Sequence, residues 1–196
     1  MKNVSFKPFM LSILILLAFV SFITACKKAD DPNIIFTIFN KTLTIGTGSV
    51  ALDSIDLNLD TKPDFRFGIE KTGTGDTSAS IMIGVPTTAF YIDSTQKISA
   101  LYLIKPLNKN EVPSIYTTGR KEWNSYSYID FKKGTEISGF AGSGDKYVPV
   151  FVNNTITGKF HYGWIRVNMS SDHNTLKIID GAYNIIPEVP IKMGAE

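Results

Sequence analysis

The segment from Asp56 to Asp64 carries side chains suited to binding a cation. Asp56, Asn58, Asp60 and Asp64 stand at relative positions 1, 3, 5 and 9, and Lys62 at position 7 would offer its main-chain carbonyl. Calcium takes about 6–8 oxygen ligands, and EF-type loops draw them from these positions. The spacing therefore indicates a structural calcium site of the weak, extracellular kind.

Two departures from the EF-type pattern favour a second interpretation, in which the segment is a polar turn. Thr61 occupies the sixth position, where such loops use Gly for a left-handed turn, and a non-Gly residue there costs roughly 1–2 kcal/mol. Phe67 occupies the twelfth position, where an EF-hand has a bidentate Glu. Because Asp and Asn side chains readily bind nearby main-chain amides, we expect a turn more than a metal site.

The second segment of chemical interest is the run Phe-His-Tyr-Gly-Trp-Ile-Arg-Val-Asn over residues 160–168. In a strand, Tyr162, Trp164 and Arg166 share one face. They could form a glycan-binding platform, with Tyr162 and Trp164 stacked on a sugar ring and Arg166 bound to its hydroxyls. Alternatively they belong to a core strand in which Arg166 pairs with a carboxylate such as Asp180. Aromatic side chains dominate core energetics, so we favour the core strand.

Groups suited to catalysis are scarce in the sequence. The chain has two histidines, His161 and His173, and one cysteine, Cys26. Two histidines cannot form a three-histidine zinc site, and no Gly-x-Ser-x-Gly elbow or His-x-x-x-His spacing is present. We expect no enzymatic activity. The alternative is a glycoside-active or other hydrolytic protein that uses a carboxylate pair which the sequence does not single out.

The elements that must position these residues show a hydrophobic period of two residues, which is typical of β-strands. Segments rich in Gly, Asn, Ser, Asp and Pro separate them, a polar loop is expected over 71–80, and no sustained helical period is found. The pattern predicts an all-β single domain over residues 34–196, a β-sandwich of jelly-roll-like or related type. The expected strands are 34–39, 43–45, 65–70, 81–83, 89–92, 98–104, 126–131, 147–152, 158–169 and 176–183.

The N-terminal residues have the pattern of a secretory signal. Two lysines precede an apolar run over residues 9–23, and small residues follow it. The string Ile23-Thr24-Ala25-Cys26 resembles a bacterial lipobox. This resemblance implies cleavage before Cys26, diacylglycerol on its sulfur and an N-acyl group such as palmitate. Lys27 follows, rather than the Asp of inner-membrane retention, which implies an outer-membrane lipoprotein with membrane face undetermined.

Removal of a signal peptide over residues 1–25 would leave a lipidated tether over residues 26–33 and a neutral β-domain. Lys2 and Lys7 leave with the signal, so 18 basic residues face 18 acidic ones. A neutral domain has no basic excess with which to bind nucleic acid. We expect a cell-envelope binding or display module whose partners are the membrane, through its anchor, and a glycan or envelope protein. A structural accessory subunit of a surface complex is the alternative.

Three motifs together resemble an uncharacterised family of secreted bacterial β-domains. They are the acidic segment Asp-x-Asn-x-Asp-x-x-x-Asp-Phe over residues 56–65, the strand with His-Tyr-Gly-Trp-Ile-Arg over residues 161–166, and Asp-Gly-Ala-Tyr over residues 180–183. The resemblance implies a secreted β-fold and no particular activity. It does not extend to residues 71–145, which could belong to the same sandwich or to an insertion.

Overall fold

The computed structural model describes residues 31–46, 49–71, 77–85, 88–98, 100–114, 123–153 and 157–196, without the side chains of residues 93 and 94. The chain divides into two units, Met1–Asp30 and Asp31–Glu196, and only the second is described below. The predicted signal peptide, Cys26 and most of the tether lie outside the described residues. No helix within the described ranges is long and apolar enough to cross a membrane.

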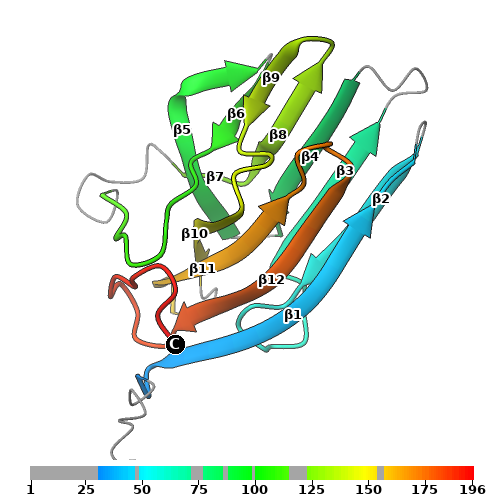
Figure 1. Ribbon diagram of the computed structural model, residues 1–196. Helices are drawn as coiled ribbons and strands as arrows, with labels where there is room; N and C mark the ends of the chain where they lie inside the picture. The colour runs from blue at the N-terminus through cyan, green and yellow to red at the C-terminus, as the bar shows by residue number, and fades with distance from the viewer. Residues whose placement is uncertain are drawn as a thin grey trace, which may run out of the picture. The chain divides into compact units, whose positions relative to one another are not determined.

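The regular structure of the described residues is entirely β, which confirms the predicted all-β class (Figure 1). The strands are β1 (Ile34–Thr44), β2 (Val50–Ile55), β3 (Phe65–Lys71), β4 (Thr77–Gly84), β5 (Thr88–Ile98), β6 (Leu101–Ile104), β7 (Trp123–Asn124), β8 (Tyr126–Lys133), β9 (Glu136–Gly139), β10 (Asp145–Asn153), β11 (Phe160–Met169) and β12 (Thr175–Asn184).

The strands form one continuous path rather than two separate sheets. Its order is β1-β12-β11-β10-β5-β6-β8-β4-β3-β2, with β7 added to β5 and β9 to β8. The β6–β8 pair is parallel, and the other pairs are antiparallel. Strand β5 pairs with β10 through its first residues and with β6 through its later ones. It therefore belongs to both layers, the β1-β12-β11-β10 layer and the β8-β4-β3-β2 layer.

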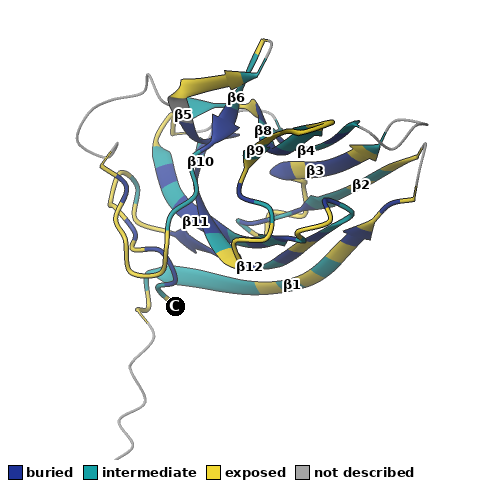
Figure 2. Ribbon diagram, turned by 45° about the horizontal axis from the view of Figure 1, so that its top comes forward, coloured by how far each residue is buried: buried dark blue, intermediate teal, exposed yellow. Residues whose placement is uncertain are grey.

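Alternation of apolar and polar residues explains which faces are buried. In β3, Phe65, Phe67 and Ile69 point into the interior, while Arg66 and Glu70 are exposed. The same alternation of buried and exposed positions is visible along several strands (Figure 2). The main core contains residues from β1, β3, β5, β10, β11 and β12, and its largest fully buried side chains include Phe65, Phe67 and Phe90.

A second, smaller hydrophobic cluster lies on the other face of β10, β11 and β12. It contains Tyr147, Trp164 and Ala182 from these strands, together with Ile191 and Met193 from the segment that follows β12. The C-terminal segment over residues 185–196 therefore covers one end of this outer face. No periodic pattern in the sequence indicates this role.

Three differences from the predicted elements are found, and two of them have local causes. Strand β4 begins at Thr77, within the expected polar loop, because Ser78 and Ser80 face inward and are buried. Strand β2 was not expected, since its apolar Val50 and Leu52 face solvent instead of the core. The expected strand over 98–104 is divided between the end of β5 and β6.

Candidate functional site

The acidic loop between β2 and β3 is held together by its own side chains. Asp56 accepts hydrogen bonds from the amides of Asp60 through Oδ1 (3.2 Å) and of Thr61 through Oδ2 (2.7 Å). Asn58 Oδ1 binds the Asp60 amide at 3.0 Å, and Asp60 Oδ1 binds the Lys62 amide at 2.9 Å. The side chains of three predicted ligand residues thus form the hydrogen bonds of a turn. This arrangement supports the polar-turn interpretation.

Asp64 differs from the other acidic residues of the loop because it is buried, with 5% of its surface exposed. Its Oδ2 accepts hydrogen bonds from the amides of Leu57 (2.8 Å) and Asn58 (3.1 Å). Burial raises the pKa of Asp64 to about 6, against the lowering effect of the two amides, and the nearby Asp56 and Asp60 raise it further. Asp64 is therefore a carboxyl group that changes charge in the mildly acidic range.

Leu59 and Thr61 of the loop have left-handed backbone conformations, with φ of 61° and 73°. Thr61 is the position at which an EF-type loop uses Gly. Among the described residues, no group of three or more His, Cys, Asp or Glu side chains is placed to hold a metal ion. Calcium at Asp56, Asn58, Asp60 and Asp64 stays a prediction.

The loop is fixed to the rest of the domain by Leu57, which is fully buried. A Cβ atom on Gly163 of β11 would lie 3.2 Å from Leu57, and one on Gly181 of β12 would lie 2.9 Å from it. These two glycines stand on neighbouring strands, so their missing side chains leave a depression that Leu57 fills. The acidic loop therefore owes its position to the two C-terminal strands.

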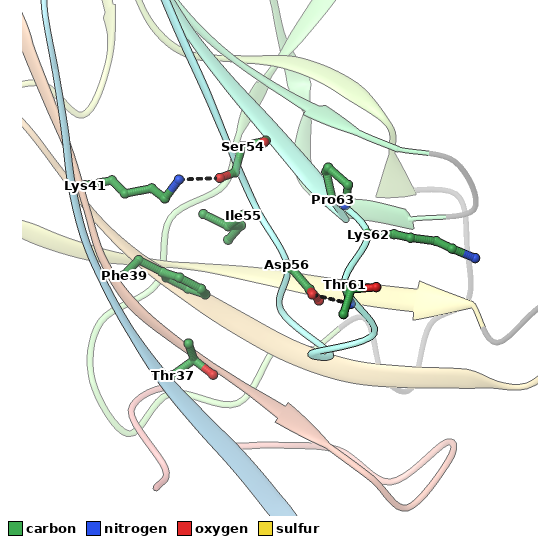
Figure 3. A pocket seen from close by; sticks show the side chains of 9 residues that line it. All are labelled: Thr37, Phe39, Lys41, Ser54, Ile55, Asp56, Thr61, Lys62 and Pro63. Atoms are coloured by element: carbon green, nitrogen blue, oxygen red, sulfur yellow. Dashed lines mark hydrogen bonds between the residues drawn. The ribbon is translucent and has the colours of Figure 1, made fainter.

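A groove opens beside the acidic loop, between β1 and β2 (Figure 3). These two strands are the opposite ends of the strand path. The groove has a volume of about 340 Å³. Apolar contact is offered by Phe39, Ile55 and Pro63, and the polar lining consists of Thr37, Lys41, Ser54, Asp56, Thr61 and Lys62.

The polar groups of the groove differ in their availability to a ligand. Lys41 Nζ is already held by Asp53 Oδ1 (2.7 Å) and by the Ser54 carbonyl (2.8 Å), which bridges the two strands. Lys62 is exposed. The hydroxyl of Thr37 is buried and has no hydrogen-bond partner among the described residues. Because this oxygen has almost no solvent-accessible surface, it offers no hydrogen bond to a ligand in the groove.

The structure excludes Trp164 as a stacking surface, because the residue is 1% exposed. Its ring lies against Tyr147 at 5.1 Å and Phe36 at 6.1 Å between ring centroids, and Ile191 and Met193 belong to the same cluster. The proposed glycan platform on this strand is therefore wrong as far as Trp164 is concerned. The core-strand interpretation describes its surroundings.

Arg166 is engaged by carboxylates rather than free to bind a sugar. It makes a bidentate contact with Asp180, in which Nε donates to Oδ1 at 2.9 Å and Nη2 donates to Oδ2. Nη1 lies 3.6 Å from Asp145 Oδ2. The side-chain hydrogen bond to Asp180, opposed by burial, raises the pKa of Arg166, so the guanidinium stays charged.

Tyr162, the third residue of the predicted platform, is half-buried in a different group of aromatic side chains. Trp123 of β7 stacks near it with centroids 6.3 Å apart, and Trp123 also meets the edge of Phe151 at 4.9 Å. Trp123 was not among the predicted site residues. The signal that could have found it is its rarity, because the chain has only two tryptophans.

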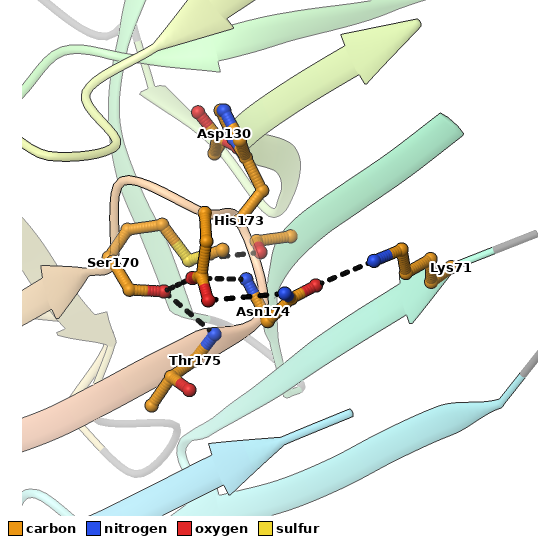
Figure 4. A network of polar contacts seen from close by, with 9 residues as sticks. Lys71, Asp130, Ser170, His173, Asn174 and Thr175 are labelled. Atoms are coloured by element: carbon orange, nitrogen blue, oxygen red, sulfur yellow. Dashed lines mark hydrogen bonds and ion pairs between the residues drawn. The ribbon is translucent and has the colours of Figure 1, made fainter. Parts of the chain in front are cut away.

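Both histidines have structural partners. His161 Nδ1 donates to the Asn184 carbonyl at 3.1 Å, and its ring stacks on Tyr183. His173, in the β11–β12 turn, contacts Asp130 of β8 through Nδ1 and Oδ2 at 2.5 Å, and both side chains are buried (Figure 4). Burial raises the pKa of Asp130, against the lowering effect of His173.

The same turn has further polar contacts. Lys71 Nζ of β3 donates to Asn174 Oδ1 at 2.9 Å, and the Thr175 amide donates to Ser170 Oγ at 2.9 Å (Figure 4). The contacts of Lys71 and Asp130 thus join the turn to the opposite layer. We assign this network a structural role.

Comparison with known proteins does not identify the chain: no protein-family model, no curated protein and no solved structure matches it.

Proposed function

We propose that the chain is a lipid-anchored outer-membrane protein whose β-domain binds a small hydroxylated ligand, such as a unit of a glycan, in the β1–β2 groove. The lipobox-like string that ends at Cys26 supports the anchor. The groove, rather than the aromatic strand, supports the binding function. The domain would act by binding and not by catalysis.

The observation that carries this proposal is the placement of the Phe39 ring in a groove whose lining also includes the exposed polar side chains of Thr61 and Lys62. A sugar ring has an apolar C–H face, which suits an aromatic ring, and hydroxyls at its edges, which suit polar partners. Lys62 adds a positively charged donor to the lining. The volume of about 340 Å³ falls within the range of about 300–1,000 Å³ for small-molecule sites.

A glycan unit fits these features better than an envelope protein does, because protein partners usually bind over larger and flatter surfaces. A hydrolytic function would need two carboxylates at the groove. Among the residues that line it, Asp56 is the single carboxylate, and both of its oxygens already accept main-chain amides. The single carboxylate of the groove therefore favours a binding function over a hydrolytic one.

The groove can be tested by saturation-transfer NMR of the purified protein with a panel of monosaccharides and short oligosaccharides. Lys62→Ala removes an exposed donor of the groove lining, and Phe39→Leu removes the ring. Ile38→Ala is the matched control, because Ile38 is 63% exposed and points to the other face of β1. We expect the two groove variants to weaken saccharide binding and the control to retain it.

Absence of binding across the panel, or equal loss in all three variants, would contradict the groove as the ligand site. The anchor has its own test. Cys26→Ser should move the protein from the detergent phase to the aqueous phase in detergent partitioning, since no acyl chain could then be attached.

A further inference from the structure

Three aliphatic side chains remain exposed in the first residues after β12. Ile185, Ile186 and Val189 are 44%, 40% and 39% exposed, although they lie within five residues of one another. The segment that carries them is fixed, because Ile191 and Met193 farther along it are buried against Trp164. We call Ile185, Ile186 and Val189 the tether-side patch.

The tether-side patch lies directly beside the point at which the tether enters the domain. The Ile185 amide donates to the Asn33 carbonyl at 2.8 Å, and the Asp31 amide donates to the Glu196 carbonyl at 3.2 Å. The start of β1 and the C-terminal segment accordingly occupy the same end of the domain (Figure 1). Two hydrogen bonds thus connect the described start of the chain to the segment that carries the patch.

The length of the tether limits how far this end can be from a membrane. Cys26 precedes Asp31 by five residues, and an extended chain spans at most about 3.6 Å per residue. An acyl anchor on Cys26 would therefore keep Asp31 within about 18 Å of the lipid surface. Exposed aliphatic side chains at this end would meet the headgroup region at high effective concentration, so even a weak affinity would suffice.

We infer that the tether-side patch rests in the headgroup region of the bilayer and orients the β-domain on the membrane. This inference depends on the lipid anchor of the proposed function. It assigns the patch to lipid rather than to a protein partner, because the short tether brings lipid to it first. The groove beside the acidic loop is not part of this contact.

The charges around the patch set its depth. Glu188 lies within the patch segment, and Asp31 and Glu196 lie at the same end of the domain. Lys192 is the basic residue of the C-terminal segment. A carboxylate in hydrocarbon is costly, so the contact is shallow. An apolar contact at this depth should also be nearly independent of salt, unlike attraction by basic residues to anionic lipids.

The test uses the full acylated protein in phospholipid vesicles that contain spin-labelled headgroups as fluorescence quenchers. Cys26 is the one cysteine of the sequence, so its acylation leaves an introduced cysteine as the only free thiol. Ile186→Cys carries an environment-sensitive fluorophore in the patch. Ile137→Cys, on β9 at the opposite end of the domain and 58% exposed, is the matched control (Figure 1).

We expect a blue shift and a large loss of emission for the probe at position 186, at low and high salt alike, and neither change at position 137. An unquenched probe at 186 on protein that mass spectrometry shows to be acylated would overturn the inference and leave the anchor intact. Equal quenching at both positions would also overturn it, because the domain would then have no preferred face. Protein without acylation would overturn both the inference and the proposed anchor.

Discussion

Arg166 and Asp180 face each other across β11 and β12, and the guanidinium grips the carboxylate through two of its nitrogens. The Asp180 side chain is almost fully buried, whereas that of Arg166 is about one-third exposed. Bidentate pairs of this kind are strong and geometrically specific. The residue that could have bound a ligand instead ties two strands together.

Replacing Asp180 by Asn should therefore destabilise the domain by about 1–3 kcal/mol, because it removes the acceptor of a charge-assisted pair. Arg166→Lys should cost part of this, since Lys cannot make the bidentate contact. Urea unfolding curves would measure both effects. Asp145→Asn is the control: Asp145 lies 3.6 Å from Arg166 and is more exposed, so its loss should change stability by less than about 0.5 kcal/mol.

Asp64 should make stability depend on pH between about 4 and 6. Its pKa is about 6 in the folded protein, against 3.8 for an unperturbed aspartic acid, so the folded state binds the extra proton in this range. The free energy of unfolding should then fall as the pH rises from 4 to 7, by up to about 3 kcal/mol. Asp64→Asn should flatten this dependence, as measured by melts at several pH values. An unchanged slope in that variant would assign the effect to other carboxyl groups.

Calcium at the acidic loop can be tested by thermal melts in EDTA, in millimolar calcium and in millimolar magnesium. A site of about millimolar affinity should add about 1 kcal/mol by mass action, which is several degrees in the melting temperature. The rise should be smaller at pH 5, because Asp64 would then be protonated. Asp60→Asn should reduce the rise. No difference between calcium and EDTA would leave Asp56, Asn58, Asp60 and Asp64 as turn-forming residues alone.

The contact between His173 and Asp130 should hold the β11–β12 turn against β8. His173→Ala should destabilise the domain by about 2–4 kcal/mol, since it leaves a buried carboxylate without its partner. Amides of residues 170–175 should exchange hydrogen faster. His173→Asn separates two causes, because Asn tolerates the left-handed backbone of this position (φ 61°) but is too short to reach Asp130. Full stability in His173→Asn would show that backbone strain, and not the contact, matters.

Gly181 should resist even the smallest side chain. A Cβ there would lie 2.9 Å from both Leu57 and the Trp164 carbonyl oxygen, so Gly181→Ala should cost about 1–3 kcal/mol and displace the acidic loop. Gly46→Ala is the control, since a Cβ at Gly46 would meet no atom within 4 Å. Unfolding curves would give the cost, and amide chemical shifts of residues 56–64 would report the displacement.

The sequence predicted those parts of the fold in which apolar residues alternate and face the core. Strands β3, β10, β11 and β12 follow this rule, and the placement of Tyr162, Trp164 and Arg166 on one face of β11 was correct. Strand β2 escaped prediction because Leu52 faces solvent, and the start of β4 because Ser78 and Ser80 face inward. A prediction from a hydrophobic period of two expects apolar side chains to face the core and polar ones to face solvent, and both strands do the opposite.

The candidate site was less accessible to sequence reasoning for a different physical reason. Whether Trp164 is exposed depends on Ile191 and Met193, which lie in a segment without periodic pattern. The groove exists because β1 and β2 meet as the two ends of the strand path, and its lining combines Thr37 of β1 with Asp56 of the loop after β2. Neither relation can be read from local spacing, because both are created by tertiary packing.

The packing of Leu57 against Gly163 and Gly181 limits how far the acidic loop can be transferred to another protein. If residues 56–64 were grafted onto another scaffold, as a cation site or as part of a ligand groove, Leu57 would lack the space in which it is buried here. The unit that can be transferred is the loop together with two neighbouring strands that each have a glycine beside Leu57, as Gly163 and Gly181 are here.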